Sequence, residues 1–382
     1  MARRLRIAQV APPFERVPPH AYGGTERVVD ELVRELHRRG HEVTTFASGD
    51  SIVPGEKVST VPEALRPKGY AGDSLPYMQL TIQKLLARAN EFDVIHSHLE
   101  WANLLVARVS PVPVVSTFHG RLDLPWAEDL LVDPPAGLVA ISESQASAHP
   151  AVPWAGVVHN GLTLTGTPPT RRRGPGLAFV GRITPEKGIV EAIEIARRVD
   201  RPLRIAAKAG PSAAERAYHD DVFLPALKAA GSLVEYIGEL SGADRDDLFA
   251  ESYATLMPGS WPEPFGLVAI ESLACGTPVV AKRIGALPEI LREGIDGYFG
   301  DDVMGMAFVV ERVEELDRDR IRTEVVERFS AARMTDGYEA IYRRVIAGSG
   351  AVGARSSDPD AGDASAPVPL HVSDRVEARA AR

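Results

Sequence analysis

The stretch LAFVGRITPEKGIVEAIEIARRV, residues 177–199, contains the pattern that decides the fold. It opens with a short apolar run, passes through a turn that ends at Gly188, and continues as a helical segment. A strand, a turn and a helix in this order form the repeating unit of a parallel α/β sheet, in which short apolar strands alternate with helices.

The same alternation extends in both directions from this stretch. Upstream, the apolar run 5–10 precedes a helix expected over residues 25–39, and Gly40 stands where a C-cap glycine belongs. The other expected strands are HEVTTFAS, DVIHSH, PVVSTFHG, GLVAIS and GVVHNG in the first half, and RPLRIAAK, SLVEYIG, ATLMPG and PVVAKRI in the second. We therefore expect an α/β protein of two doubly wound, Rossmann-like domains that face one another across a cleft, with ligands at the carboxyl ends of the strands.

Changes in composition set the domain boundaries along the 382 residues. The expected parts are an N-terminal domain over 1–165, a Pro-, Gly- and Arg-rich linker over 166–176, a C-terminal domain over 177–330, a closing helix over 331–347 and a tail over 348–382. The tail is rich in Gly, Ala, Ser, Pro and Asp and is expected to be disordered.

Charge and cysteine content disfavour several classes of protein. The chain has 43 Lys and Arg against 52 Asp and Glu, a net charge of −9, which disfavours a general nucleic-acid-binding protein. A single cysteine can form no intramolecular disulfide, Cys-based zinc site or iron–sulfur cluster. No apolar run reaches the roughly 18–20 residues of a membrane span, and the N-terminus has no signal-peptide pattern. We expect a cytoplasmic protein, with its oligomeric state left open.

Two turns are candidates for binding an anion. Gly23 and Gly24 precede the first helix, where glycine allows close backbone approach and the helix start offers unpaired N–H groups. A merely flexible turn is an equal alternative at that position. Arg182 and Lys187 follow a strand and precede a helix. A guanidinium fork and an ammonium charge together suit a diphosphate. The alternative is an exposed turn with two solvated cations, and the position at the end of a strand favours the binding role. Since the GxGxxG fingerprint is absent, a nicotinamide or flavin enzyme is disfavoured.

A pair of carboxylates is a candidate for binding hydroxyl groups. Glu263 and Glu271 are separated by seven residues, with Phe265 and Gly266 in the turn that enters a helix. Glu271 is expected one turn into that helix. Acidic groups at a helix start can also be partners of the helix dipole alone. The backbone N–H groups beside Glu263 favour a binding role.

His119 ends the strand PVVSTFHG, at the edge where ligands are expected. His96 and His98 end another strand, and with Glu100 they allow a metal site as one alternative. We interpret the two as polar lining of the cleft. No Asp-x-Asp pair in a suitable position, P-loop or GxSxG motif is present, so no metal site is expected.

Four motifs together resemble the family-4 retaining glycosyltransferases, which have the two-domain GT-B fold and belong to the group 1 glycosyltransferases. They are YGGTE (22–26), STFHG (116–120), GRITPEKG (181–188) and PEPFGLVAIESLACGTPVVA (262–281), and the resemblance covers roughly residues 3–347. It implies the transfer of a sugar from a nucleotide diphosphate sugar, as co-substrate, with retention of anomeric configuration. It also implies that no metal and no other cofactor is required.

The resemblance assigns the diphosphate to four residues. Gly23 and Gly24 would approach the diphosphate or the leaving group closely. Arg182 and Lys187 would neutralise its charge, as a metal does in other transferases.

The resemblance also assigns the sugars and the reacting centre. Glu263 would bind hydroxyls of the donor sugar, Glu271 those of the ribose, and His119 would lie near the reacting centre, so that His119 and Glu263 are the expected catalytic residues. The backbone groups expected near the donor sugar belong to Phe265, Gly266 and Leu267.

Front-side attack through a short-lived oxocarbenium ion is the mechanism that the resemblance implies, with a donor phosphate oxygen as base. Closure of the domains would exclude water. One departure is Lys208, which stands in RIAAKAGPS where a Gly-rich turn is usual. The alternatives are a nucleotide-sugar epimerase-like enzyme and a non-catalytic nucleotide-sugar-binding protein, although the latter would tend to lose Glu263 or His119. The sugar, the base and the acceptor, whether glycan, small molecule or lipid, stay open.

Overall fold

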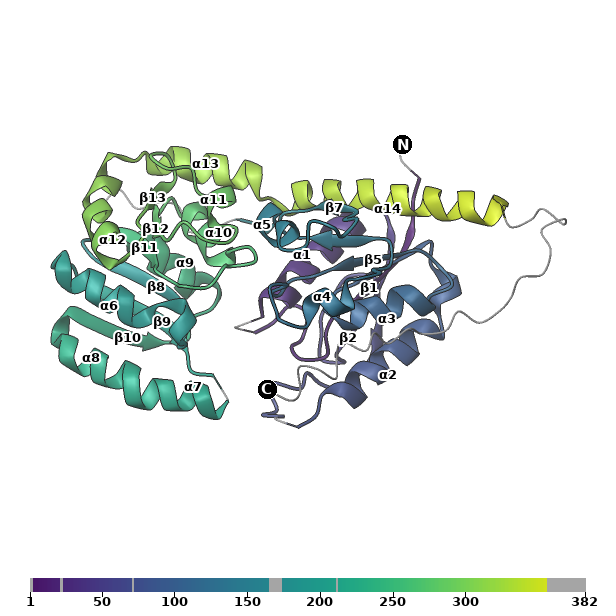
Figure 1. The fold of residues 1–382 in the computed structure, drawn as a ribbon, viewed down its shortest axis with the longest axis horizontal. Coiled ribbons are helices and arrows are strands. Elements are labelled where there is room, and N and C mark those ends of the chain that lie inside the picture. Colours follow the sequence, from purple (N-terminus) through teal and green to yellow (C-terminus); the bar gives the residue numbers. More distant parts are fainter. Residues whose placement is uncertain (1–2, 21–22, 71, 165–173, 211, 356–382) are drawn as a thin grey trace. The chain divides into compact units, whose positions relative to one another are not determined.

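The computed structural model describes residues 3–20, 23–70, 72–164, 174–210 and 212–355, with backbone alone for 350–355 (Figure 1). The described residues up to Ile346 form one compact unit. Most of the predicted linker and of the predicted tail lies outside the described residues.

The N-terminal domain is built on a seven-stranded parallel sheet with the order β3-β2-β1-β4-β5-β6-β7. Its strands are β1 (Arg6–Val10), β2 (Glu42–Ala47), β3 (Glu56–Ser59), β4 (Val94–Ser97), β5 (Val114–Thr117), β6 (Leu138–Ala140) and β7 (Gly156–Val157). Its helices are α1 (Gly24–Arg38), α2 (Leu75–Leu86), η1 (Ala89–Glu91), α3 (Ala102–Val109), α4 (Ala127–Leu130) and α5 (Glu143–Ser147).

Alternate residues of these strands pack on opposite faces of the sheet. Ile7 and Val94 belong to a core cluster with α1 and the last helix, whereas Ala8 and Ile95 belong to a cluster with α2 and α3. Helices therefore cover both faces, which explains why the strands are almost continuously apolar.

The C-terminal domain repeats this plan with six parallel strands in the order β10-β9-β8-β11-β12-β13. Its strands are β8 (Leu177–Arg182), β9 (Leu203–Lys208), β10 (Val234–Gly238), β11 (Ala254–Met257), β12 (Val279–Ala281) and β13 (Gly297–Phe299). Its helices are η2 (Pro185–Lys187), α6 (Ile189–Arg198), α7 (Ala213–Tyr218), η3 (His219–Phe223), α8 (Leu224–Ala230), η4 (Gly231–Leu233), α9 (Gly242–Glu251), α10 (Leu267–Ala274), α11 (Leu287–Ile290), α12 (Val303–Val310), η5 (Glu311–Glu315) and α13 (Arg318–Arg328).

Both sheets reverse their strand order at one point, between β1 and β4 and between β8 and β11. The predicted fold class, two doubly wound Rossmann-like domains, is confirmed. In such sheets the crevice at the reversal point, beyond the carboxyl ends of the strands, is where ligands bind.

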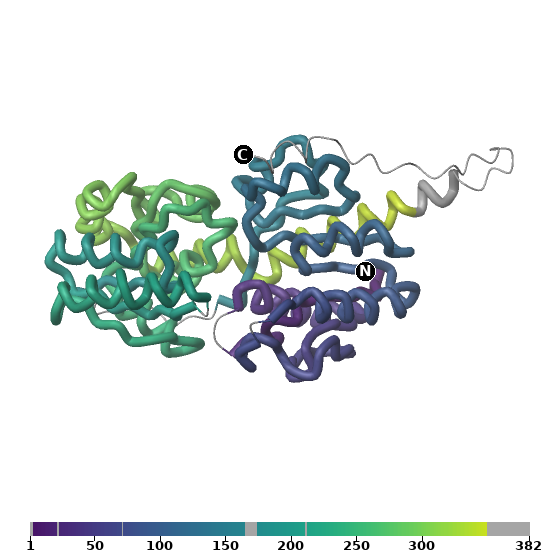
Figure 2. The backbone as a smooth tube through the Cα atoms, turned by 60° about the horizontal axis from the view of Figure 1, so that its bottom comes forward, coloured from purple at the N-terminus to yellow at the C-terminus, as the bar shows by residue number. Residues whose placement is uncertain are grey.

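The chain returns to the N-terminal domain through α14 (Ala331–Arg355). The segment after β7 and the segment between α13 and α14 run side by side. Leu162 N–H donates to Phe329 O at 3.0 Å, and Ala331 N–H donates to Leu162 O at 3.1 Å. Tyr338 and Tyr342 of α14 are fully buried there, and Figures 1 and 2 both show this part of α14 along the N-terminal domain. The helix continues past the boundary predicted at residue 347.

None of the helices in the described part of the chain combines the length and the apolar character needed to cross a bilayer.

Candidate active site

Two turns at the carboxyl edge of the C-terminal sheet pack against each other. One follows β8 and contains η2, and the other follows β11. Ser260 N–H donates to Glu186 O at 3.0 Å, which joins them. Gly188 has φ 75°, and a Cβ on it would lie 2.8 Å from the carbonyl carbon of Pro258. Only glycine fits this close approach, so the GRITPEKG motif serves the geometry of both turns.

Lys187 forms an ion pair with Glu263 across these turns. Its ammonium nitrogen also lies 5.0 Å from the centre of the Trp261 ring. The guanidinium of Arg121 lies 5.1 Å from the same ring. Arg121 comes two residues after His119, so Trp261 connects the motif STFHG of the N-terminal domain with the turn that contains Glu263.

Arg182 ends β8 and has two carboxylate partners, Glu215 at 3.2 Å and Glu186 at 3.5 Å. Its Nε and the indole Nε1 of Trp261 are buried, and within the described residues neither has a hydrogen-bond partner. An unmade hydrogen bond of a buried group costs about 1–3 kcal/mol. The edge therefore holds two N–H donors that a ligand can satisfy.

Glu271 lies one turn into α10, as predicted, and is 6% exposed. It forms an ion pair with Arg27 of α1 and a second one, at 3.5 Å, with Arg245 of α9. Burial lowers the pKa of Arg27 to about 10, to which the neighbouring charge of Arg245 contributes, and burial also lowers the pKa of Arg245. Two guanidinium groups thus share the carboxylate of Glu271, and Asp246 lies 3.7 Å from Arg245 as a further acidic neighbour.

The turn before α10 is anchored by Phe265, whose ring packs against those of His159 and Phe329 at centroid distances of 5.7 and 5.8 Å. Gly266 has φ 110° and precedes Leu267, the first residue of α10. The N–H groups of the first helical turn have no partner within the helix. The backbone donors predicted beside Glu263 are thus at a helix start.

The glycine pair of the N-terminal domain meets this helix start. Gly24 begins α1, and a Cβ on Gly24 would lie 3.2 Å from Cδ1 of Leu267. A Cβ on Gly23 would lie 3.2 Å from a carboxylate oxygen of Glu26. The structure therefore brings Gly23 and Gly24 to the same place as Leu267 and the Arg27–Glu271 pair.

His119 follows β5, and its ring nitrogen Nε2 lies 2.9 Å from Nδ1 of His98. The backbone N–H groups of His119 and Gly120 donate to the Glu100 carboxylate at 3.1 and 3.2 Å. Burial lowers the pKa of His119 to about 4 and raises that of Glu100 to about 7. The imidazole is therefore neutral near pH 7. No contact in the described part of the chain joins His119 to Glu263 directly.

The interpretation of His96 and His98 as polar lining of the cleft is wrong, because both side chains have no exposed surface. Their ring nitrogens are hydrogen-bonded within the domain, His96 to Tyr342 and Thr117 and His98 to His119 and Gln9. Across the described ranges, no group of three His, Cys, Asp or Glu side chains is arranged to hold a metal ion.

Four residues of the candidate site, two from each domain, were not predicted from the sequence: Arg27, Arg121, Arg245 and Trp261. Arg27 looks like an ordinary solvated helix residue in the sequence, and its partner Glu271 is 244 positions away. Trp261 could have been found from the sequence, because the pair Trp261-Pro262 stands directly before the motif EPFG.

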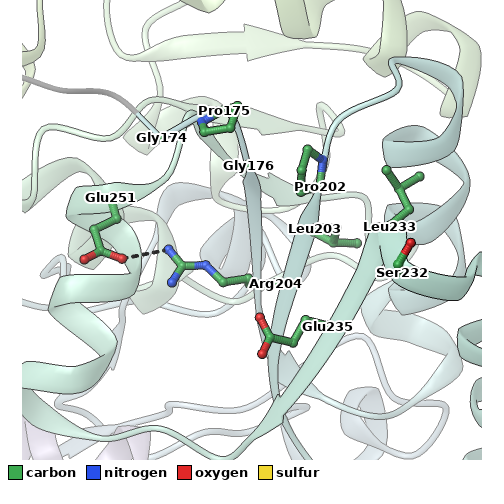
Figure 3. Close-up of a pocket in the computed structure, with 10 residues that line it drawn as sticks. All are labelled: Gly174, Pro175, Gly176, Pro202, Leu203, Arg204, Ser232, Leu233, Glu235 and Glu251. Atoms are coloured by element: carbon green, nitrogen blue, oxygen red, sulfur yellow. Dashed lines mark hydrogen bonds and ion pairs between the residues drawn. The ribbon is translucent and has the colours of Figure 1, made fainter.

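A cavity of about 380 Å³ lies at the opposite edge of the C-terminal sheet, where β8 and β9 begin (Figure 3). The figure shows Arg204 directed toward Glu251, with which it forms an ion pair of 3.1 Å. None of the predicted site residues lines this cavity.

Two parallel, doubly wound α/β domains, with ion pairs at the carboxyl edge of the second sheet, define a two-domain protein of the Rossmann-like class. Two family models match this chain, Glycosyltransferase Family 4 over residues 22–164 and Glycosyl transferases group 1 over residues 169–332. The chain belongs to the family-4, group 1 glycosyltransferases, as the motifs predicted, and is an enzyme of the transferase class.

Individual relatives agree with this assignment. The D-inositol 3-phosphate glycosyltransferase of Mycobacterium tuberculosis is 29% identical over 383 aligned residues, which cover 85% of this chain and 79% of the relative. The crystal structure of AviGT4, a glycosyltransferase involved in avilamycin A biosynthesis, is 26% identical with a TM-score of 0.65, covering 90% of this chain and 98% of that one.

Sucrose-phosphate synthase from Thermosynechococcus elongatus has a TM-score of 0.72 at 18% identity, covering 90% of this chain and 100% of that one. HepE from Anabaena, in complex with UDP and glucose, has a TM-score of 0.68 at 17% identity and covers 88% and 99%. At these identities the likeness shows the fold alone, which is GT-B.

Proposed function

We propose that this enzyme transfers a sugar from a nucleotide diphosphate sugar to a hydroxyl of an acceptor, with retention of configuration and without a metal ion. The observation that carries the proposal is the set of cations and unpaired donors at the carboxyl edge of the C-terminal sheet: Lys187 paired with Glu263, and the buried N–H groups of Arg182 and Trp261 without partners in the described chain.

The ion pairs of the site suit a ligand with one anionic and one hydroxylated part. A diphosphate takes the place of the carboxylate beside Lys187, and Glu263 is then free to accept hydrogen bonds from hydroxyls of the donor sugar. In the same way, Glu271 exchanges Arg27 for the ribose hydroxyls. Lys187 therefore has an anionic partner before and after binding, and Glu271 keeps its ion pair with Arg245.

The chemistry needs charge stabilisation more than proton transfer from the protein. As the bond from the anomeric carbon to the diphosphate oxygen breaks, negative charge grows on the leaving group, where Arg182 and Lys187 lie. A phosphate oxygen of the donor takes the proton of the attacking hydroxyl on the same face, which retains the configuration. Gly23, Gly24 and the helix start at Leu267 let the backbone approach the leaving group.

A structural relative with bound ligands supports a nucleotide-sugar donor. HepE is described in complex with UDP and glucose and with UDP-glucose. Arg182 and Lys187 support charge stabilisation without a metal ion, because both carry a fixed positive charge at the carboxyl edge. A non-catalytic binder is less well supported, since both His119 and Glu263 are present in the site.

The test is a thermal-unfolding panel of nucleotide sugars on the wild type, on Glu271→Gln and on Glu289→Gln. Glu289 is a matched control because it also joins the domains, accepting from the N–H groups of Glu143 and Ser144 at 2.8 and 2.7 Å. A donor at about 100 times its Kd stabilises by roughly 2.7 kcal/mol. We expect this shift in the wild type and in Glu289→Gln, and its loss in Glu271→Gln.

If no nucleotide sugar raises the unfolding temperature of the wild type, the donor site is refuted. Retention is checked separately by proton NMR of the first product formed, with water as acceptor if no other is found. A product of inverted anomeric configuration contradicts front-side attack and leaves the donor assignment standing.

A further inference from the structure

A chain of hydrogen bonds runs from His119 through the interior of the N-terminal domain to α14. His119 Nε2 lies 2.9 Å from His98 Nδ1, and His98 Nε2 lies 3.0 Å from the side-chain oxygen of Gln9. The side-chain nitrogen of Gln9 donates to the hydroxyl of Tyr342 at 3.0 Å. Gln9, His98 and Tyr342 have no exposed surface, so bulk water does not compete for these bonds.

A second branch leaves the same hydroxyl of Tyr342. Its oxygen lies 2.7 Å from His96 Nδ1, and His96 Nε2 lies 2.8 Å from the hydroxyl of Thr117. Thr117 in turn donates to the hydroxyl of Tyr338 at 3.1 Å. The branch ends on α14, one helical turn before the point at which it began.

With the Gln9 amide oxygen facing His98, as in this structure, these contacts determine the positions of the protons. The amide oxygen of Gln9 only accepts, so His98 carries its proton on Nε2 and presents a lone pair at Nδ1. His119 must then donate from its own Nε2. The second branch agrees, because the hydroxyl of Tyr342 accepts from the Gln9 amide and is left to donate to His96.

The imidazoles stay neutral, which this arrangement requires. Burial lowers the pKa of His119 to about 4, and it holds the pKa values of His96 and His98 well below their ordinary value. A second proton on His96 or His98 would sit on Nδ1 and face the donor hydroxyl of Tyr342 or the donor N–H of His119.

We infer that Gln9 and His98 are positioning residues that hold His119 in the tautomer protonated at Nε2, so that its Nδ1 accepts a hydrogen bond from a substrate hydroxyl. Within the described residues, the hydrogen bonds of His119 involve Nε2 and the backbone N–H, and Nδ1 has no partner. The inference rests on the place near the reacting centre that is proposed above for His119. It also gives α14 a part in the site, since Tyr342 orients the amide of Gln9.

The first experiment measures the tautomer without a substrate. Two-bond proton–nitrogen correlation spectra of the full chain, labelled with nitrogen-15 histidine, distinguish protonated from unprotonated ring nitrogens, and the His119 signals are assigned by their loss in His119→Ala. We expect a proton on Nε2 and none on Nδ1. A proton on Nδ1 in the wild type overturns the inference.

The second experiment compares two variants that each remove one buried polar group of the network. Gln9→Met removes the acceptor of His98 at similar side-chain length, whereas Tyr338→Phe removes only the far end of the other branch. We expect Gln9→Met to mix the two tautomers of His119 and to lower kcat about tenfold or more, with the KM for the donor unchanged. Tyr338→Phe should leave the tautomer, kcat and KM as in the wild type.

Equal effects of the two variants on tautomer and kcat would reduce the network to a structural role and overturn the inference. The proposed function fails in a different way. If His119→Ala retains full activity while the wild-type tautomer is as expected, the network exists but His119 has no place in the reaction, and the inference falls with the role proposed for His119 and not with the donor site.

Discussion

The carboxyl edges of the two sheets have opposite electrostatic character, although the strands of both sheets follow the same order. The N-terminal edge is built around neutral buried groups, in which the imidazoles of His98 and His119 are hydrogen-bonded to each other and His98 is also hydrogen-bonded to Gln9. The C-terminal edge holds ion pairs, of which Lys187–Glu263 and Arg182–Glu215 are examples.

This difference indicates how each edge prepares for a ligand. Neutral hydrogen bonds between buried groups set the geometry before the ligand arrives and do not change partners when it binds. Ion pairs satisfy charges that would otherwise be costly to bury, and they can exchange a carboxylate for a phosphate. We therefore expect the N-terminal edge to orient and the C-terminal edge to bind and stabilise charge.

The largest effect is expected from removing a charge at the C-terminal edge. Arg182→Ala should lower kcat by about 100-fold or more, since it withdraws a donor from the charge that develops on the leaving group. The measurement is nucleoside diphosphate release at a saturating concentration of the donor found by thermal unfolding.

Arg204→Ala is the matched control for this prediction. Arg204 lies on the neighbouring strand β9 and is also ion-paired, with Glu251, but at the opposite edge of the sheet (Figure 3). It should lose little activity, as surface ion pairs contribute about 0–1 kcal/mol. Similar losses in both variants would show that the arginines serve the fold and that the edge is not a site of charge stabilisation.

The second prediction tests whether the N-terminal edge prefers to be neutral. Burial raises the pKa of Glu100 to about 7 from its ordinary value of 4.5. The folded state therefore binds this proton more tightly than the unfolded state, and the stability that results is present below about pH 4.5 and lost as the pH rises through about 7. Gln at this position does not titrate.

The difference in unfolding temperature between Glu100→Gln and the wild type should thus move in favour of the variant between about pH 5 and about pH 8, by up to roughly 3 kcal/mol in free energy. Glu63→Gln, on the exposed surface, is the control for the substitution itself. A difference that is constant over this range contradicts a neutral carboxyl group at Glu100.

Much of the fold could be predicted because its signals are local. The apolar runs and helix-spaced segments gave both domains. The motifs placed His119 and Arg182 at the carboxyl ends of strands and Glu271 one turn into a helix, as the structure has them. The strand β3, with the sequence EKVS at the sheet edge, was missed because an exposed edge strand needs no apolar run.

The partners within the site could not be predicted, because they depend on contacts between distant segments. Whether Arg27 is solvated or paired is decided by the approach of α10, and whether His96 lines a cleft or is buried is decided by α14, whose Tyr338 and Tyr342 contact it. The sequence marks these residues as polar, and only the packing of the two domains and of α14 turns them into one ion-paired edge and one neutral edge.

A smaller effect is expected from Gly266, which sharpens the comparison by separating geometry from charge. Gly266→Ala introduces a Cβ at φ 110°, within 3.1 Å of Leu287 Cδ2 and 3.4 Å of Ile290 Cδ1. Strain in this backbone region costs about 1–2 kcal/mol, and the contacts add to it. The measurement is the free energy of unfolding together with the Kd of the donor.

Gly40→Ala is the control, since Gly40 has φ 88° and no atom lies within 4 Å of its added Cβ. It should destabilise by backbone strain alone and leave donor binding unchanged. If Gly266→Ala also leaves the donor Kd unchanged, the helix start at Leu267 takes no part in binding, and the ion pairs must account for donor affinity on their own.

The smallest effect is expected from chelation, and it tests the C-terminal edge most directly. If Arg182 and Lys187 carry the charge of the leaving diphosphate, activity should be unchanged after treatment with EDTA, because two fixed cations supply what a divalent ion would otherwise provide. Activity is measured before and after chelation and again after Mg²⁺ is added. Loss of activity on chelation, with recovery in Mg²⁺, would contradict the role given to Arg182 and Lys187. The account of the N-terminal edge would stand, since its hydrogen bonds involve no ion.

Persistence of activity in EDTA, together with its loss in Arg182→Ala, would assign the charge stabilisation to the protein itself.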